Sequence, residues 1–124
     1  MAGTMQTRPI TVVETQLFAR AAEKIWSEPE LAELIDHVAH NPEAGDVIPG
    51  TGGVRKLRWS RPGSGKRGGA RVVYFYYRPD RPLYLLLAYA KAQATDLTPD
   101  EKRAVAAFAA TIKGALEGPR GDER

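Results

Sequence analysis

Hydrophobic residues recur along this chain with two spacings, which predict helices and strands in alternation. Apolar side chains three and four residues apart predict helices at Leu17–Ile25, Leu31–Val38 and Val105–Leu116. Short β-branched and aromatic runs predict strands at Ile10–Glu14, Val54–Trp59, Ala70–Tyr77 and Leu83–Ala90. Two helices therefore precede three closely spaced strands, and one helix follows them.

Helix boundaries are marked by capping sequences. Ser27–Glu30 (SEPE) reads as a capping box that opens the second helix, and Asn41-Pro42 ends that helix. Thr98–Glu101 (TPDE) opens the last helix with proline at its first position, and Gly118 is its predicted stop.

The connections between the last three strands are short, so neighbouring strands in this group must be antiparallel. The order β-α-α-β-β-β-α predicts an α+β fold, with two N-terminal helices and a C-terminal helix packed on an antiparallel sheet. We expect one domain over residues 10–118, with flexible tails at 1–9 and 119–124. Gly45–Gly53 and Ser60–Gly69 are predicted loops because both are rich in glycine.

Composition excludes several classes of protein. A chain of 124 residues is one domain, and the lack of cysteine excludes a disulfide framework, a thiolate metal site and a cysteine nucleophile. No apolar run is long enough for a membrane span, and the first residues lack the apolar segment of a secretion signal. We therefore expect a cytoplasmic protein with no membrane contact.

The net charge of +3 hides a strong asymmetry. The 33 residues Val47–Pro79 contain no Asp or Glu, whereas all fifteen acidic residues lie elsewhere. The cations of this basic third are Arg55, Lys56, Arg58, Arg61, Lys66, Arg67, Arg71 and Arg78. Such a segment is typical of a protein that meets a polyanion with one face, although a solvated run of charges is the alternative.

Two local patterns suggest a dinucleotide site and a metal site, but the surrounding sequence supports neither well. Gly63–Gly68 (GSGKRG) matches G-x-G-x-x-G, but a strand follows it where a dinucleotide site needs a helix. We interpret it as a loop whose Lys66 and Arg67 reach phosphates, or as a solvated hairpin tip. His37 and His40 have metal-ligand spacing without an evident third ligand, so we expect surface histidines, no metal and no cofactor.

Side-chain alternation along Val54–Trp59 separates two sets of residues. Leu57 and Trp59 share one face, which suits the core, and Lys56 and Arg58 share the other. The apolar strands that follow carry Arg71 at the start of one and Lys91 at the end of the other. In a meander these four cations converge on one concave surface; the alternative is that they are gatekeepers at a sheet edge.

Taken together, these segments resemble the RelE/ParE superfamily of bacterial toxins, and most of all its HigB-like branch. The resemblance spans residues 10–113, and its motifs are GTGGVRKLR (50–58), GKRGGARVVY (65–74), LLLAYAK (85–91) and DLT (96–98). It implies a small RNase-like α+β fold and the toxin of a type II toxin–antitoxin pair. It further implies an mRNA interferase that acts in the ribosomal A site, and a helix-turn-helix antitoxin as partner.

The resemblance also implies roles for individual residues. The catalytic set that it implies is Lys56, Arg58, Arg71 and Lys91. The further residues expected to contact RNA are Arg55, Arg61, Lys66, Arg67, Arg78 and Tyr89. Ala92 stands where the family often has arginine, and Thr98 stands where RelE has a tyrosine. Tyr89 either stacks on a base or belongs to the core.

Metal-independent RNA cleavage by the neighbouring 2′-hydroxyl suits these residue types. Arginines bind the pentacoordinate phosphorane in a bidentate manner, which assigns Arg58 and Arg71 to its charge. Lys56, crowded by other cations, is the expected general base, and Lys91 the acid or a phosphate clamp. Two alternatives remain: a ParE-like inhibitor of DNA gyrase, and an RNA-binding domain without catalytic activity.

Overall fold

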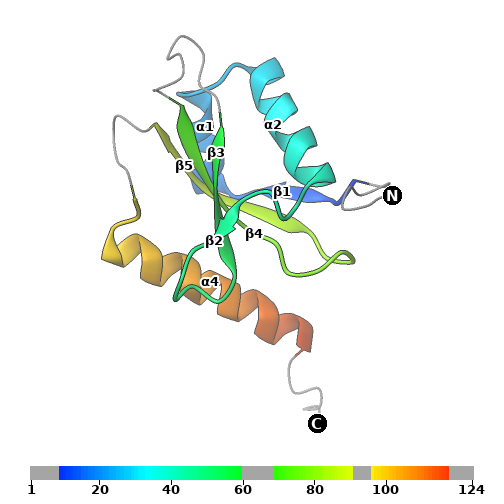
Figure 1. The fold of residues 1–124 in the computed structure, drawn as a ribbon, viewed down its shortest axis with the longest axis vertical. Coiled ribbons are helices and arrows are strands. Elements are labelled where there is room, and N and C mark those ends of the chain that lie inside the picture. The colour runs from blue at the N-terminus through cyan, green and yellow to red at the C-terminus, as the bar shows by residue number, and fades with distance from the viewer. Residues whose placement is uncertain (1–8, 60–68, 91–95, 118–124) are drawn as a thin grey trace.

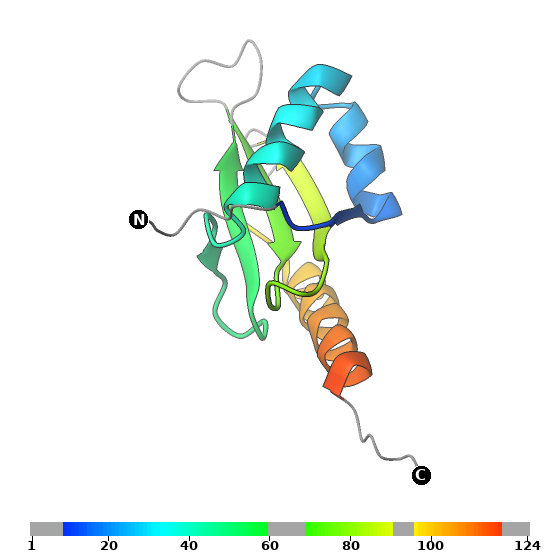
Figure 2. The same cartoon turned by 90° about the vertical axis from the view of Figure 1, so that its right-hand side faces the viewer.

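The computed structural model describes residues 9–59, 69–90 and 96–117. Its elements are β1 (Val12–Glu14), α1 (Gln16–Glu23), α2 (Glu28–His40), β2 (Asp46–Val47), β3 (Val54–Trp59), β4 (Ala70–Phe75), β5 (Leu83–Ala90) and α4 (Pro99–Glu117). Figure 1 shows α2 beside the upper part of the sheet, α1 partly hidden behind β5 and β3, and α4 across the lower part, and Figure 2 shows the same molecule turned by 90°. The predicted tails, apart from Pro9, lie outside the described residues.

The predicted helix starts are confirmed in atomic detail. Ser27 N–H donates to Glu30 Oε1 at 2.7 Å, and Glu30 N–H donates back to the Ser27 hydroxyl at 3.3 Å. Thr98 and Glu101 make the same reciprocal pair at 2.9 and 3.1 Å, immediately before and within the first turn of α4. Both boxes satisfy amide groups that a helix start leaves without partners.

The meander of β3, β4 and β5 is confirmed, but the sheet as a whole is mixed. Its order is β1-β5-β4-β3-β2, and β1 runs parallel to β5, with Val12 opposite Leu83. The expectation of a fully antiparallel sheet is therefore wrong. The reason is physical: short connections fix only neighbours in sequence, whereas the α1–α2 segment and three strands separate β1 from β5.

Two smaller differences concern strand limits. β2 lies inside the segment Gly45–Gly53 that was expected to be a loop, and it pairs with β3 through Asp46 opposite Lys56 and Val47 opposite Arg55. β4 ends at Phe75 rather than Tyr77. A strand of two residues has too few side chains to show a period of two, so sequence alternation cannot reveal it.

The sheet is covered on both faces by two separate cores. Phe18 of α1 and Leu34 of α2 pack with Tyr74 and Leu85 on one face. Val105 and Ala109 of α4 pack with Val73 and Phe75 on the other. Burial on both faces explains the apolar run Val72–Phe75 of β4. None of the helices in the described part has the length and apolarity that crossing a bilayer requires.

Tyr74 ties the sheet to the segment after α2. Its hydroxyl accepts from Gly45 N–H at 2.8 Å and donates to the Pro42 carbonyl at 2.8 Å, in a buried site. Tyr74→Phe removes both bonds and is expected to lower the free energy of unfolding by about 1–3 kcal/mol, because the Gly45 N–H is left buried without a partner. Urea unfolding measures this. Tyr76→Phe is the control, since its hydroxyl makes no hydrogen bond within the described residues, and an equal loss in both variants would contradict the prediction.

Candidate active site

Three neighbouring strands place polar side chains in one row on the α4 side of the sheet. Arg58 of β3 lies opposite Arg71 of β4, and Arg71 lies opposite Tyr89 of β5. Lys56 is two residues from Arg58 on the same strand and so shares its face. The alternate residues Leu57 and Trp59 pack into the core under α1 and α2, as predicted. The structure thus brings Lys56, Arg58 and Arg71 to one surface.

Arg58 and Arg71 form a cationic pair without a carboxylate. Like charges directly opposite each other in a sheet are destabilising. Within the described residues, no Asp or Glu oxygen lies within 4.0 Å of either guanidinium, and Arg71 makes only a 3.5 Å contact with the Ala70 carbonyl. A bound anion would relieve their repulsion, because each planar guanidinium can take two oxygens of a phosphate.

Lys56, in contrast, has an acidic partner. Its Nζ lies 3.3 Å from Oδ1 of Asp96, just before α4, and the side chains are 29% and 71% exposed. The same Oδ1 accepts the Leu97 N–H at 2.9 Å. That amide and then the Lys56 ammonium hold the pKa of Asp96 below its usual range. Asp96 belongs to the DLT motif, but its contact with Lys56 spans 40 positions and has no sequence signal.

Tyr89 completes the row with a phenol rather than a charge. Its hydroxyl oxygen is buried and has no hydrogen-bond partner among the described residues, and its ring packs against the core under α4. Burial raises the pKa of Tyr89, the charge of Asp96 raises it further, and Arg71 opposes both. A neutral hydroxyl without a partner therefore lies close to the charges of Arg71 and Asp96.

A comparison with known families shows the family of the chain. Residues 10–118 match the family model described as the RelE toxin of the RelE/RelB toxin–antitoxin system. The chain belongs to the RelE toxin family. It is thus a toxin that functions with an antitoxin partner, as the sequence motifs imply.

Other residues expected to contact RNA lie apart from the row in this RelE-family toxin, or outside the described residues. Arg55 is on the opposite face, where its guanidinium donates to the carbonyls of Gly45 at 2.7 Å and Glu43 at 3.3 Å. Alternation could have revealed this, because Arg55 has the same parity as Leu57 and Trp59. Arg78 lies after β4, 3.0 Å from Asp80. The candidates outside the described residues are Arg61, Lys66, Arg67 and Lys91.

Each of the two histidines of the toxin contacts a neighbouring group of the fold. The His37 ring lies 4.8 Å from the Trp59 ring, and His40 Nδ1 lies 2.9 Å from the Asp36 carbonyl oxygen. In the segments that the structure describes, no group of three or more His, Asp or Glu side chains is close enough together to hold a metal ion.

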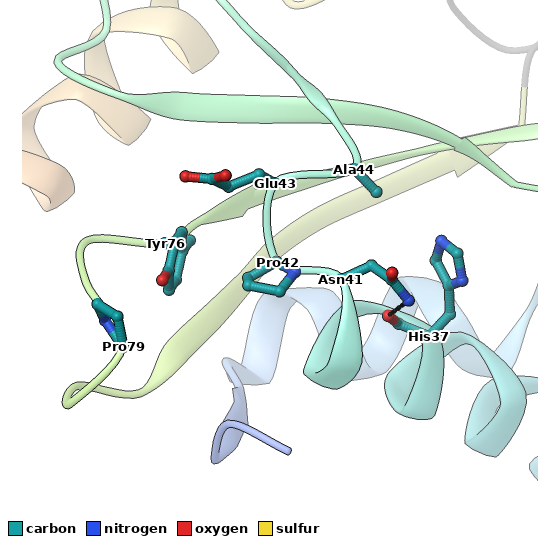
Figure 3. A pocket seen from close by; sticks show the side chains of 7 residues that line it. All are labelled: His37, Asn41, Pro42, Glu43, Ala44, Tyr76 and Pro79. Atoms are coloured by element: carbon teal, nitrogen blue, oxygen red, sulfur yellow. Dashed lines mark hydrogen bonds between the residues drawn. The ribbon is translucent and has the colours of Figure 1, made fainter. Parts of the chain in front are cut away.

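The RelE-family toxin also has an open pocket of about 550 Å³ beside the end of α2 (Figure 3). Its lining residues are His37, Asn41, Pro42, Glu43, Ala44, Tyr76 and Pro79. Glu43 is the charged side chain in this lining, and Tyr76 packs on the α1–α2 face of the sheet. The pocket therefore lies across the sheet from the cationic row and lacks the cations that a phosphate requires.

Proposed function

We propose that this RelE-family toxin is an endoribonuclease that cleaves mRNA on the ribosome and thereby inhibits translation. The observation that carries the proposal is the pairing of Arg58 with Arg71, in register and without a carboxylate within the described residues. Lys56 adds a third cation to the same face. A surface of this kind binds a phosphodiester and stabilises additional negative charge on it.

The reaction that fits these groups is attack by the 2′-hydroxyl on the adjacent phosphorus. The O2′–P bond forms while the P–O5′ bond breaks, which leaves a 2′,3′-cyclic phosphate and a 5′-hydroxyl. Charge accumulates on the two non-bridging oxygens in the transition state, and in this proposal Arg58 and Arg71 bind those oxygens. The reaction requires no metal ion, and it restricts the enzyme to RNA because DNA lacks the nucleophile.

The partners proposed for this activity follow from the family and the motifs. The RelE/RelB system supplies an antitoxin, and we propose a helix-turn-helix protein in that role, as in the HigB-like branch that the motifs resemble. The substrate is mRNA in the ribosomal A site. Lys91, which the sequence assigns as acid or phosphate clamp, remains part of the proposal, although it lies outside the described residues.

Purified toxin added to a translating extract tests the proposal. We expect primer extension to reveal new 5′ ends within the translated mRNA, and a parallel assay of gyrase supercoiling to show no inhibition. RNA that is bound but not shortened would identify a silent RNA-binding domain. Gyrase inhibition with intact mRNA would identify a ParE-like toxin, and either result would refute the nuclease.

A further inference from the structure

The ion pair between Lys56 and Asp96 bears on which group removes the proton from the 2′-hydroxyl. A lysine accepts a proton only in its neutral form. In this structure the Lys56 nitrogen lies 3.3 Å from a carboxylate oxygen of Asp96 and donates a hydrogen bond to it. Lys56 as placed here binds and orients the Asp96 carboxylate, a group that can itself accept a proton.

We propose that Asp96 is the general base of the cleavage reaction and that Lys56 holds its carboxylate in place beside the scissile phosphate. The inference rests on the proposed nuclease function and names a catalytic residue for it. The sequence motifs alone assign the base to Lys56, so the two assignments are distinct and make different predictions.

The two carboxylate oxygens of Asp96 have different surroundings. Oδ1 accepts from both Leu97 N–H and Lys56 Nζ, which fixes the orientation of the group. Oδ2 makes no hydrogen bond to any described residue, and the side chain is 71% exposed. One oxygen is thus anchored, while the other is open to a substrate hydroxyl.

Charged groups from several elements surround this carboxylate. Lys56 approaches from β3 and Lys102 from α4, and both stabilise the ionised form. Tyr89 of β5 lies within the influence of Asp96, of Arg71 on β4 and of Glu101 on α4. Since the nearest of these groups are cations, Asp96 is ionised at neutral pH and needs no prior deprotonation before it acts. The same cations make it a weaker base, which limits the gain in rate.

The proposed step balances without a cofactor. Asp96 Oδ2 takes the proton of the 2′-hydroxyl as the O2′–P bond forms. The P–O5′ bond breaks, and the departing oxygen takes a proton from water. The carboxyl group of Asp96 then returns its proton to solvent, so the enzyme is restored. Arg58 and Arg71 bind the negatively charged non-bridging oxygens throughout.

Asp96→Asn is the direct test, measured as single-turnover cleavage of ribosome-bound mRNA. The asparagine carbonyl can still accept the Leu97 N–H, so the start of α4 is retained, but the group no longer accepts a proton. We expect the rate to fall about 10²–10⁴-fold, which is the usual contribution of general base catalysis. Asp100→Asn is the matched control, because it makes the same charge change in the first turn of α4 at an exposed residue paired with Arg103.

Two further measurements distinguish a base from a structural role. With Asp96 as base, the wild-type rate is expected to stay nearly constant between about pH 6.5 and 8, whereas a lysine base would make the rate rise with pH as the neutral amine becomes more abundant. Lys56→Arg keeps the cation but cannot act as base. We expect this variant to cleave at least about tenfold faster than Asp96→Asn.

The outcomes separate this inference from the proposed function. If the wild type cleaves mRNA and Asp96→Asn cleaves at the same rate, Asp96 is not the base and the nuclease proposal stands. A rate that rises with pH, combined with an inactive Lys56→Arg, would return the role to Lys56. If the wild type leaves mRNA intact, the nuclease proposal itself fails.

Discussion

Arg71→Ala is expected to abolish growth inhibition while the protein stays folded. The half-buried guanidinium lies on the α4 side of β4, and its one hydrogen bond within the described residues is the 3.5 Å contact with Ala70. Its loss therefore costs the fold little. In the proposed reaction it removes one of two groups that stabilise the phosphorane, and loss of one such donor lowers the rate about 10²–10³-fold. The rate of mRNA cleavage and the growth of cells after induction both measure this effect.

Arg20→Ala provides the matched control for that experiment. Arg20 is an exposed cation on the last turn of α1, on the other side of the sheet, so its removal changes the net charge equally without touching the row. We expect it to remain toxic. Circular dichroism and thermal unfolding establish that both variants are folded. A folded Arg71→Ala variant with wild-type toxicity would remove Arg71 from the active site.

The largest effect on stability is expected at Phe18. This side chain of α1 is fully buried in the core between the helices and the sheet. Phe18→Ala removes a ring and leaves a cavity, which costs about 3–5 kcal/mol of unfolding free energy. Small domains have about 5–15 kcal/mol in total, so the variant is expected to unfold at a much lower urea concentration.

Leu17, next to Phe18, provides a control that distinguishes the effect of burial from that of helix propensity. Leu17 lies on the same turn of α1 but is 59% exposed. Leu17→Ala is expected to change the unfolding free energy by less than about 0.5 kcal/mol. Similar urea midpoints for the two variants would mean that α1 does not pack on the sheet as described.

Local sequence signals predicted the parts of the fold that depend on neighbours in sequence. The limits of β3 follow from alternation and those of β5 from its apolar run, and the start of α2 follows from Ser27 and Glu30. The pairing of β1 with β5 could not be predicted in this way. It depends on a register between Val12 and Leu83 that neither segment encodes alone.

In the candidate site, too, features set by local sequence could be predicted and features set by long-range contacts could not. Alternation on β3 and a meander suffice to bring Lys56, Arg58 and Arg71 to one face, and this is the arrangement in the structure. The position of Asp96 depends on how the start of α4 lies over β3, which is a long-range contact. Charge alone also could not separate Arg55, which binds carbonyl groups, from the cations of the row.

The parallel pairing of β1 with β5 has a consequence for the order of events during synthesis of the toxin. Chains emerge from the ribosome N-terminus first, at about 5–20 residues per second. β1 is made early, yet its hydrogen-bonding partner Leu83 and the last strand of the row, with Tyr89, are made late. Closing so long a loop is slow compared with forming the β3–β4 hairpin. The nascent toxin therefore stays without the complete row of Arg58, Arg71 and Tyr89 until most of its chain has been translated.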